Sequence, residues 1–491
     1  MNILPVLPQV VPLATAVLAL SARKNRRVQQ SVALLGATLH IVVAAVLFLE
    51  VWNGGPARLQ MGAWAAPFGI VVYVDTLSAG LVVVTAIVHF AVTGFQLANA
   101  DEDRRRSDFW PLANTLVMGV QGAFLTGDLF NLYVWFEVLL ISSFVLVAIG
   151  NARAQVEAAA KYVVLNLLSS TCFLVAIALL YGATGTLNLA ELSIALHQPG
   201  GVPLVSSIAV LFVVGFGIKA AMFPFGLWLP TAYGSPPAGL AALLAGLLTK
   251  VGVYAFLRTG ALMFDDVVPW FDDLLLVCAF VSMAVGALGA LAQVTLRGAV
   301  VHSVVFAVGF MLIGISTGTE QGRAGTIAYL LSDMLVVTTL LLVCGEVERI
   351  TRGRRLTDMG GLYRSHPLLA IAFIVAAFSV AGFPPLVGFW GKLAILDALT
   401  AVGRWPGVIA ALAGSAVVLA SIAQAWSLGV WKQAPAALAT PVVAWGRLVP
   451  IVLLVALVAV VSFAPGPLFA VADRAAAELS DVEAYRKGVL E

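Results

Sequence analysis

Five charged or titratable residues lie deep inside long apolar stretches of the sequence. They are Glu137, Lys219, Lys250, His302 and Lys392. A charge near the centre of a bilayer costs about 2.5 to 3.5 kcal/mol on insertion scales, so each of these residues needs a partner, water or a functional role. Desolvation favours the neutral form of a lysine whereas a nearby carboxylate favours the ammonium, so a buried lysine can hold and release a proton in turn. The five residues are therefore candidates for a proton relay, with Glu137 and Lys219 as the pair that switches it.

Each of the five also has a structural explanation that the sequence leaves open. Glu137 and Lys219 are compatible with a static ion pair that fixes helix packing. Lys250 and Lys392 are compatible with side chains that extend to the membrane interface, although their depth makes this awkward. A packing histidine with a satisfied hydrogen bond explains His302 as well as a relay does.

Two aspartates are candidate additional members of the relay. Asp333 lies about halfway along an apolar stretch, where a hydrogen bond between helices is an equally good explanation. Asp397 follows Lys392 by five residues and lies nearer a predicted helix end, which favours a solvated carboxylate over a proton exit.

The apolar stretches that must position these residues make up nearly the whole chain. Of 491 residues, 61% are hydrophobic and 11% are charged, and the mean hydropathy is +1.02. Soluble proteins are about half apolar and a quarter charged, so a water-soluble globule is excluded. A β-barrel is excluded as well, because its strands alternate polar and apolar residues whereas these stretches are continuously apolar. The sequence predicts an all-α polytopic membrane protein.

About fourteen segments are long enough to cross the hydrocarbon core, which takes roughly 20 apolar residues. The first begins with apolar residues and has no small-residue cleavage site, so we expect a spanning helix and not a removable signal peptide. The predicted helices cover residues 4–22, 31–52, 72–97, 110–126, 129–149, 157–181, 204–231, 237–263, 273–293, 298–317, 322–347, 367–402, 407–431 and 446–466.

Basic residues gather in alternate connections and predict the orientation. Arginines in segments 23–27, 104–106 and 349–364 all fall on one side of the predicted bundle. Positively charged connections mark the cytoplasmic side, and the first of them directly follows the first helix, so the N-terminus lies outside. Because the number of helices is even, the C-terminus lies on the same side. On that outer side, the loop over 53–70 and the VVYV stretch that follows it are compatible with a hairpin.

Two predicted helices are longer than the bilayer requires and contain prolines next to a lysine. Pro224 follows Lys219 by five residues, and Pro384 and Pro385 precede Lys392. Proline removes a backbone donor and frees carbonyl groups one turn earlier, which invites water into the helix break. The two segments are five helices apart and so run in opposite directions, which is typical of broken helices at matching positions of inverted repeats in transporters. Simple proline kinks are the alternative.

Motifs for other chemistry are missing from the sequence. The three cysteines lie in apolar stretches without metal-ligand spacing, and there is no P-loop or dinucleotide-binding glycine motif. The net charge of +2, without a basic stripe, gives no indication of nucleic-acid binding. A sodium cage needs several converging oxygens, whereas only Glu137 and Asp333 are deep carboxylates. We therefore predict protons as the substrate, with no cofactor and no bound metal.

Three long motifs resemble one family of membrane proteins. They are GDLFNLYVWFEVLLISSFVLV around Glu137, GIKAAMFPFGLWLPTAYGSPPAGLAALLAGLLTKVGVYAFLR with Lys219 and Lys250, and AGFPPLVGFWGKL with Lys392. They are similar to the proton-translocating antiporter family that is shared by Mrp-type cation/proton antiporters and respiratory complex I. The resemblance covers essentially the whole chain. The length of the chain and the sequence of its motif around Glu137 are most similar to the D subunits of the Mrp group.

The resemblance implies two inverted five-helix repeats, each with a broken helix, and a hydrated polar axis along the membrane midplane. The repeats would cover 110–264 and 265–432, with three helices in 1–109 and a last helix with a short outward tail in 433–491.

The resemblance also assigns roles to individual residues. Glu137 and Lys219 match the family's glutamate–lysine pair, Lys250 its central lysine, and Lys392 the charged residue of the second broken helix. The chain departs from relatives at Ala307 and Val337, where they often have a histidine and commonly a lysine. Water or His302 would then have to bridge the relay between Lys250 and Lys392.

The sequence thus predicts a proton-translocating subunit of a multisubunit sodium/proton antiporter in a bacterial cell membrane, and not an enzyme. Partner subunits of a hetero-oligomer would handle sodium at least partly. The alternative is an antiporter-like subunit of a complex I or membrane-bound hydrogenase type proton pump. A non-transporting scaffold, which keeps buried charges only for assembly, also stays open. A stand-alone carrier of an organic solute is weaker, because no anion-coordinating arginine lies at mid-membrane depth.

Overall fold

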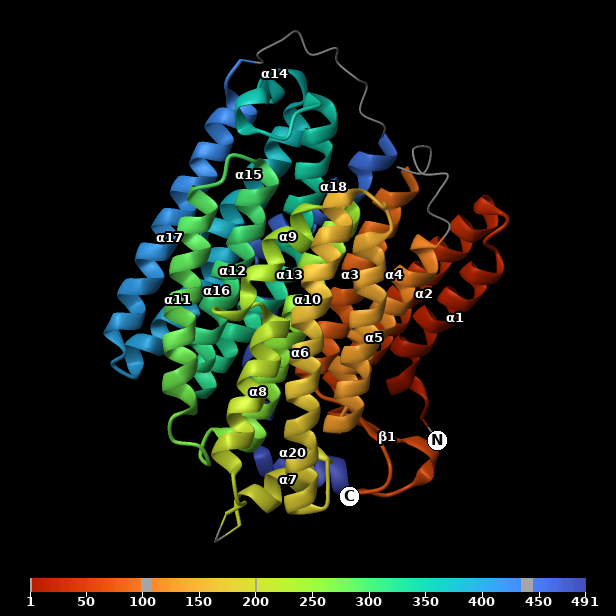
Figure 1. Ribbon diagram of the computed structural model, residues 1–491, viewed down its shortest axis with the longest axis vertical. Helices are drawn as coiled ribbons and strands as arrows, with labels where there is room; N and C mark the ends of the chain where they lie inside the picture. The colour runs from red at the N-terminus through yellow and green to blue at the C-terminus, as the bar shows by residue number, and fades with distance from the viewer. Residues whose placement is uncertain (1, 99–107, 199–200, 434–444) are drawn as a thin grey trace.

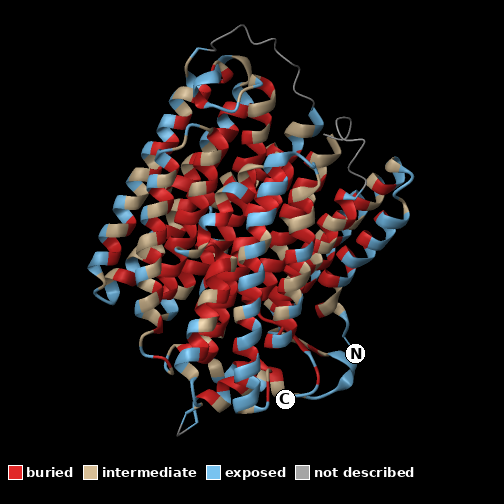
Figure 2. Ribbon diagram, in the orientation of Figure 1, coloured by how far each residue is buried: buried red, intermediate tan, exposed pale blue. Residues whose placement is uncertain are grey.

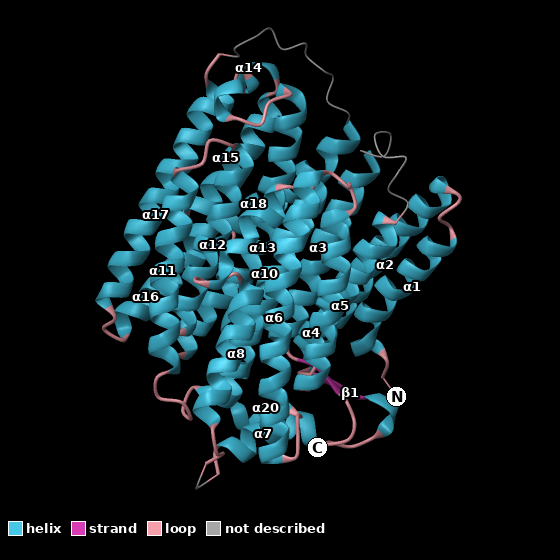
Figure 3. Cartoon of the chain, viewed as in Figure 1, coloured by secondary structure: helices cyan, strands magenta, loops and turns pink. Residues whose placement is uncertain are grey.

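The computed structural model describes residues 2–98, 108–198, 201–433 and 445–491. It is a bundle of long helices, with both ends of the chain at the same end of the bundle (Figure 1). Helices make up most of the described chain, and strands occur only in one small hairpin of that part (Figure 3). The predicted all-α polytopic fold is confirmed.

The long helices follow one another through the bundle with mostly short connections. They are α1 (Leu7–Ser21), α2 (Arg26–Gly54), α3 (Thr76–Ala98), α4 (Phe109–Leu125), α5 (Leu129–Ala148), α6 (Arg153–Thr184), α8 (Val205–Ala220), α10 (Ala238–Thr259), α11 (Phe271–Leu291), α12 (Leu296–Ile315), α13 (Glu320–Thr351), α15 (Pro367–Ala381), α16 (Val387–Ala401), α17 (Trp405–Trp426) and α18 (Trp445–Phe463). The short helices are α7 (Leu189–Leu196), α9 (Leu229–Gly234), α14 (Leu362–Ser365), α19 (Gly466–Ser480) and α20 (Val482–Leu490).

In the described ranges, 12 helical segments are long and apolar enough to cross a membrane. Two of the fourteen predicted positions fall outside that set. One is α4, which has 17 residues, and the other is the predicted helix 367–402, which the structure divides into α15 and α16 of 15 residues each.

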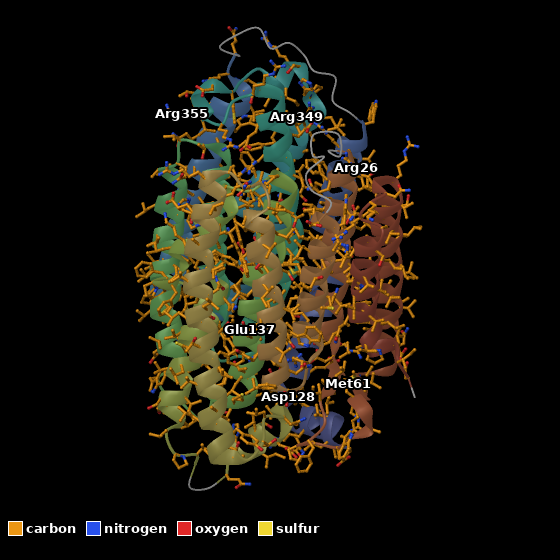
Figure 4. All side chains as sticks on the ribbon, turned by 45° about the vertical axis from the view of Figure 1, so that its right-hand side comes forward. Arg26, Met61, Asp128, Glu137, Arg349 and Arg355 are labelled. Carbon is orange, nitrogen blue, oxygen red and sulfur yellow. The ribbon has the colours of Figure 1, made fainter. Side chains whose placement is uncertain are left out.

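The end of the bundle opposite the chain termini carries many of the arginines. Arg26, Arg349 and Arg355 lie there, whereas Met61 and Asp128 lie toward the other end (Figure 4). This distribution agrees with the predicted grouping of basic connections, although segment 104–106 lies outside the described residues. At the end with the termini, β1 (Ala57–Gln60) pairs antiparallel with β2 (Val71–Val74), so the predicted hairpin is confirmed.

The segment after residue 466, predicted as a short tail, is folded into α19 and α20. Arg474 of α19 donates to the carbonyl of Trp52 at 2.6 Å and its guanidinium lies over the Trp52 ring. Glu478 accepts from both the backbone N–H and the hydroxyl of Thr76 at 2.8 Å. These contacts attach the end of the chain to the ends of α2 and α3.

Both predicted helix breaks are present. The first lies between α8 and α9, where Ala221 takes a left-handed conformation with φ of +60° just before Pro224. The second lies between α15 and α16, where Gly382 has φ of +79° just before Pro384 and Pro385. A left-handed residue at a helix C-terminus ends the helix because its N–H turns back to earlier carbonyls. The interruptions are therefore full helix ends and not kinks.

Helices α10 and α13 form the centre of the bundle, because their apolar windows are completely buried. Figure 2 shows the same distribution, with buried residues inside and exposed residues on the outer helices. Helix α10 is attached to α3 by Arg258, whose guanidinium contacts the two carboxylate oxygens of Asp75 at 2.5 and 3.0 Å. Burial opposes ionisation of Asp75, but the Arg258 charge holds the pKa of that carboxyl below its usual range.

A close approach of α10 to the first break depends on Gly252. A Cβ at this position would lie 2.8 Å from Cα and 2.9 Å from Cβ of Ala220, the last residue of α8. Only a residue without a side chain allows α8 to end directly against the helix that carries Lys250.

We predict that Gly252→Ala destabilises the protein, by about 1 to 3 kcal/mol, because the backbones of α8 and α10 must separate. Thermal unfolding of the purified protein in detergent measures this as a lower Tm. The control is Gly234→Ala in α9, where an added Cβ meets no atom within 4 Å. Equal Tm values for the two variants would contradict this packing.

Candidate functional site

The most buried charge pair of the site joins α10 to α13. Lys250 Nζ lies 2.8 Å from Asp333 Oδ2, and the side chains are 0% and 1% exposed. The ammonium also donates to the carbonyl of Ala245 at 3.0 Å. Asp333 Oδ2 has no hydrogen-bond partner within the described ranges, and its contact with Lys250 is an ion pair. Asp333, predicted only as an additional member, thus directly contacts the central lysine.

Lys392 is the second buried lysine on which the Asp333 carboxylate acts. Its ammonium donates across the second helix break to the carbonyls of Val380 and Ala381, at 2.9 and 3.2 Å. These carbonyls belong to the last turn of α15 and lack a helical partner because the helix ends there. Asp333 is the charged group that acts on Lys392 electrostatically, without an ion-pair contact. The break therefore supplies acceptors for the lysine, whereas the sequence predicted water at the freed carbonyls.

Aromatic rings complete the surroundings of Lys392. Its Nζ lies 4.8 Å from the ring centre of Phe306, 5.3 Å from that of Phe310 and 5.7 Å from that of Tyr329. The faces of aromatic rings attract a cation in a desolvated site. These rings stabilise the buried ammonium.

Glu137 and Lys219 are neighbours without direct contact. Lys219 lies in the last turn of α8, and its Nζ lies 5.5 Å from the ring centre of Phe136 on α5. Glu137, the next residue, lies between the two ends of the bundle and acts on Lys219 electrostatically (Figure 4). The ion pairs within 4 Å found in the described ranges do not include these two residues, and Glu137 Oε1 is buried without a hydrogen-bond partner there. Glu137 and Lys219 are thus neighbours, but they do not form the predicted ion pair in this structure.

The contacts found for His302 in the described ranges involve neither of the two central lysines. Its Nδ1 lies 2.8 Å from the carbonyl of Gly298, one turn earlier in α12. Its ring packs against Gly289 of α11, where a Cβ would lie 3.2 Å from the ring Cγ. Sequence reasoning assigned the link between Lys250 and Lys392 to water or His302, whereas Asp333 is the group that contacts Lys250 and acts electrostatically on Lys392. A relay role for His302 stays a prediction that these contacts do not support.

Asp397 lines a surface cavity of about 460 Å³ between α13, α16 and α19. Glu320 and Asp473 line it as well, and Gln321 donates to Asp397 at 2.6 Å. Asp397 is thus exposed among other carboxylates, as expected for a solvated helix end.

A second buried polar cluster was missed by sequence reasoning. Nδ1 of His40 lies 3.2 Å from Nδ1 of His89, and Nε2 of Gln121 lies 2.7 Å from Nε2 of His40. The Gln121 amide also donates to the carbonyl of Val82, which fixes its orientation and makes His40 Nε2 an acceptor. Two histidines in neighbouring apolar stretches were the available signal, but neither has a charged residue near it in the sequence.

The described residues hold no group of three or more His, Cys, Asp or Glu side chains arranged to bind a metal ion. The arrangement can instead hold protons, because three lysines and two carboxylates come together from five helices of a membrane-spanning bundle, and two of the lysines lie at helix breaks. Interrupted helices with buried charges at their ends define the class of ion-translocating membrane proteins.

Comparison with known proteins gives the family. Residues 126–418 match the sequence model of the transmembrane part of the NADH:quinone oxidoreductase/Mrp antiporter family. The chain belongs to this family. It is 35% identical over 491 residues to the D subunit of the Na(+)/H(+) antiporter of Alkalihalophilus pseudofirmus, with 100% of both chains covered.

Solved structures agree with this result. A chain of the Mrp complex from Dietzia sp. DQ12-45-1b superposes with a TM-score of 0.92, with 28% identity and 100% of both chains covered. A chain of respiratory complex I from Thermus thermophilus has the same fold, with a TM-score of 0.84, 24% identity, and coverage of 97% of this chain and 99% of that one.

We predict that Asp333→Asn lowers the free energy of unfolding by about 3 to 5 kcal/mol, because it leaves the Lys250 ammonium buried without a counter-charge. The double variant Lys250→Met/Asp333→Leu should recover most of this loss, since it removes both charges together. Thermal or denaturant unfolding of the purified protein measures both effects.

The control for this prediction is the exposed pair of Lys161 and Glu157, whose side chains are 55% and 61% exposed. Glu157→Gln should leave the stability nearly unchanged, because solvent screens an exposed ion pair. A stability of Asp333→Asn equal to that of the unaltered protein would contradict the pairing.

Proposed function

We propose that the protein is a proton-translocating subunit of a multisubunit sodium/proton antiporter. Protons move along a buried axis of Glu137, Lys219, Lys250, Asp333 and Lys392. The observation that carries the proposal is the single carboxylate of Asp333, which contacts Lys250 and acts on Lys392. The relatives named as D subunits of Na(+)/H(+) antiporters support it.

The shared carboxylate couples the two central lysines. One carboxylate offsets the charge of one buried ammonium, so a proton that arrives on Lys392 competes with Lys250 for Asp333. The ammonium that loses this competition is destabilised and releases its proton. Proton occupancy of one lysine therefore changes the affinity of the other, without a large movement of the helices.

The variable distance between Glu137 and Lys219, which are neighbours without an ion-pair contact, acts as the switch. Closing this distance stabilises the Lys219 ammonium, and opening it favours release of the proton toward α10. The energies are adequate, because one charge that crosses 100 mV gains about 2.3 kcal/mol and one pH unit corresponds to about 1.4 kcal/mol.

We further propose the arrangement in the membrane. The end with the chain termini faces outward, and the protein lies in a bacterial cell membrane. Residues 110–264 and 265–432 form the two inverted repeats, with one broken helix and one lysine at the break in each. The carboxylate-lined cavity at Asp397 is the outward connection of Lys392, which lies on the same helix, α16.

Partner subunits carry at least part of the sodium step in this proposal. A sodium ion needs several oxygen ligands, whereas Asp333 is already held by Lys250. The protein then acts as the proton-handling subunit of a hetero-oligomer and not as an enzyme.

We predict that Lys219→Ala abolishes the sodium-dependent collapse of a pH gradient in inverted vesicles from antiporter-deficient cells that express the whole gene cluster. The loss follows because the switch then has no proton-carrying group beside Glu137. The comparison is made at equal amounts of assembled complex, with Lys161→Ala as the control because this exposed lysine pairs only with Glu157 in the described contacts. A normal sodium response in assembled Lys219→Ala would move the proton path to another subunit.

A further inference from the structure

A small cavity adjoins Lys219 between four helices. It has a volume of about 20 Å³, and its walls include Phe136 of α5, Asn166 of α6, Lys219 of α8 and Val251 of α10. A cavity of this size holds one water molecule, provided that polar groups bind it. Trp228 closes another side and is itself fixed by a hydrogen bond from its indole N–H to the carbonyl of Ile218 at 3.0 Å.

Asn166 presents an unused acceptor in this region. Its Nδ2 donates to the carbonyl of Tyr162, one turn earlier in α6, at 3.0 Å. That hydrogen bond fixes which end of the amide is the donor, so the other end is Oδ1. The residue is 1% exposed, and Oδ1 has no hydrogen-bond partner among the described residues. A buried carbonyl oxygen without a partner is unfavourable unless water satisfies it.

Lys219 presents unused donors to the same cavity. An ammonium has three N–H groups. The ammonium lies 5.5 Å from the centre of the Phe136 ring, and Glu137 acts on it electrostatically without an ion-pair contact. No hydrogen bond within the described ranges is donated by its Nζ. A group with spare donors and a group with a spare acceptor therefore line one space that fits one water molecule.

We propose that Asn166 is a positioning residue that holds a water molecule against the Lys219 ammonium. The water accepts from Lys219 Nζ and donates to Asn166 Oδ1. The water thereby gives Lys219 a second partner besides Glu137. Helix α10 contributes Val251 to the wall of the same cavity, and Val251 follows Lys250 in the sequence. This inference rests on the proposed function. The water molecule is the group that binds the Lys219 ammonium when the distance between Lys219 and Glu137 increases.

The chain contains a matched control for this residue. Asn114 of α4 is also 1% exposed, donates from Nδ2 to the carbonyl of Trp110 at 2.9 Å, and has Oδ1 without a partner in the described contacts. It does not line the cavity at Lys219. Asn166→Leu and Asn114→Leu therefore remove the same chemistry from the same kind of helix position, and only the first removes it from beside Lys219.

The test compares these variants in assembled complex, by the sodium-dependent pH response of inverted vesicles. We expect Asn166→Leu to slow the response by about tenfold or more, which corresponds to loss of one hydrogen bond to a charged group. Asn114→Leu should stay within about twofold of the unaltered protein, because its lost polar atom touches no charged group. Asn166→Ser should restore most of the rate, because a serine hydroxyl can donate to the carbonyl one turn earlier and still accept from water.

A structural readout is independent of transport. Electron cryomicroscopy of the assembled complex should show density for one water molecule between Lys219 Nζ and Asn166 Oδ1, and this density should be missing in Asn166→Leu. Equal rates for the two leucine variants, or no water density in the unaltered complex, would overturn the role of Asn166. A complex that shows no sodium response even without substitutions would instead reject the proposed function, so the two failures are distinguishable.

Discussion

The placement of one carboxylate between two buried lysines is the constraint on which the rest of the structure depends. Asp333 lies on α13, and its two lysine neighbours come from α10 and from the second broken helix. Two ammonium groups cannot both remain stable in a dry interior beside a single negative charge unless other acceptors are supplied. The bundle supplies those acceptors for Lys392 through backbone carbonyls and aromatic rings, so its charge does not depend on Asp333 alone.

The helix breaks follow from the same requirement. An unbroken helix satisfies all its carbonyls internally and has none to offer a cation. Ending α15 at Ala381 leaves two carbonyls for Lys392, while ending α8 at Ala220 leaves Lys219 in the last turn beside a small cavity. The breaks therefore have an electrostatic function, since they place backbone acceptors and space next to the charges. The Asp75–Arg258 ion pair attaches α10 to the start of α3, and Gly252 lets α10 pack directly against the end of α8.

Much of the fold and part of the site could be predicted from the sequence. Apolar length located the spanning helices, and the prolines at 224, 384 and 385 located both breaks, because these features act locally on the backbone. The partner of Lys250 could not be predicted, since it depends on which faces α10 and α13 present to each other. For the same reason the sequence did not show that His302 faces α11, that Glu137 and Lys219 stand apart, or that His40 meets His89.

The most direct test of the central claim is the sodium-dependent pH response of inverted vesicles that contain the assembled complex with Asp333→Asn. We expect loss of the response, because the neutral amide no longer couples Lys250 to Lys392, and partial recovery with Asp333→Glu, which keeps the charge. An undiminished response in Asp333→Asn would contradict the shared carboxylate as the link in the proton path.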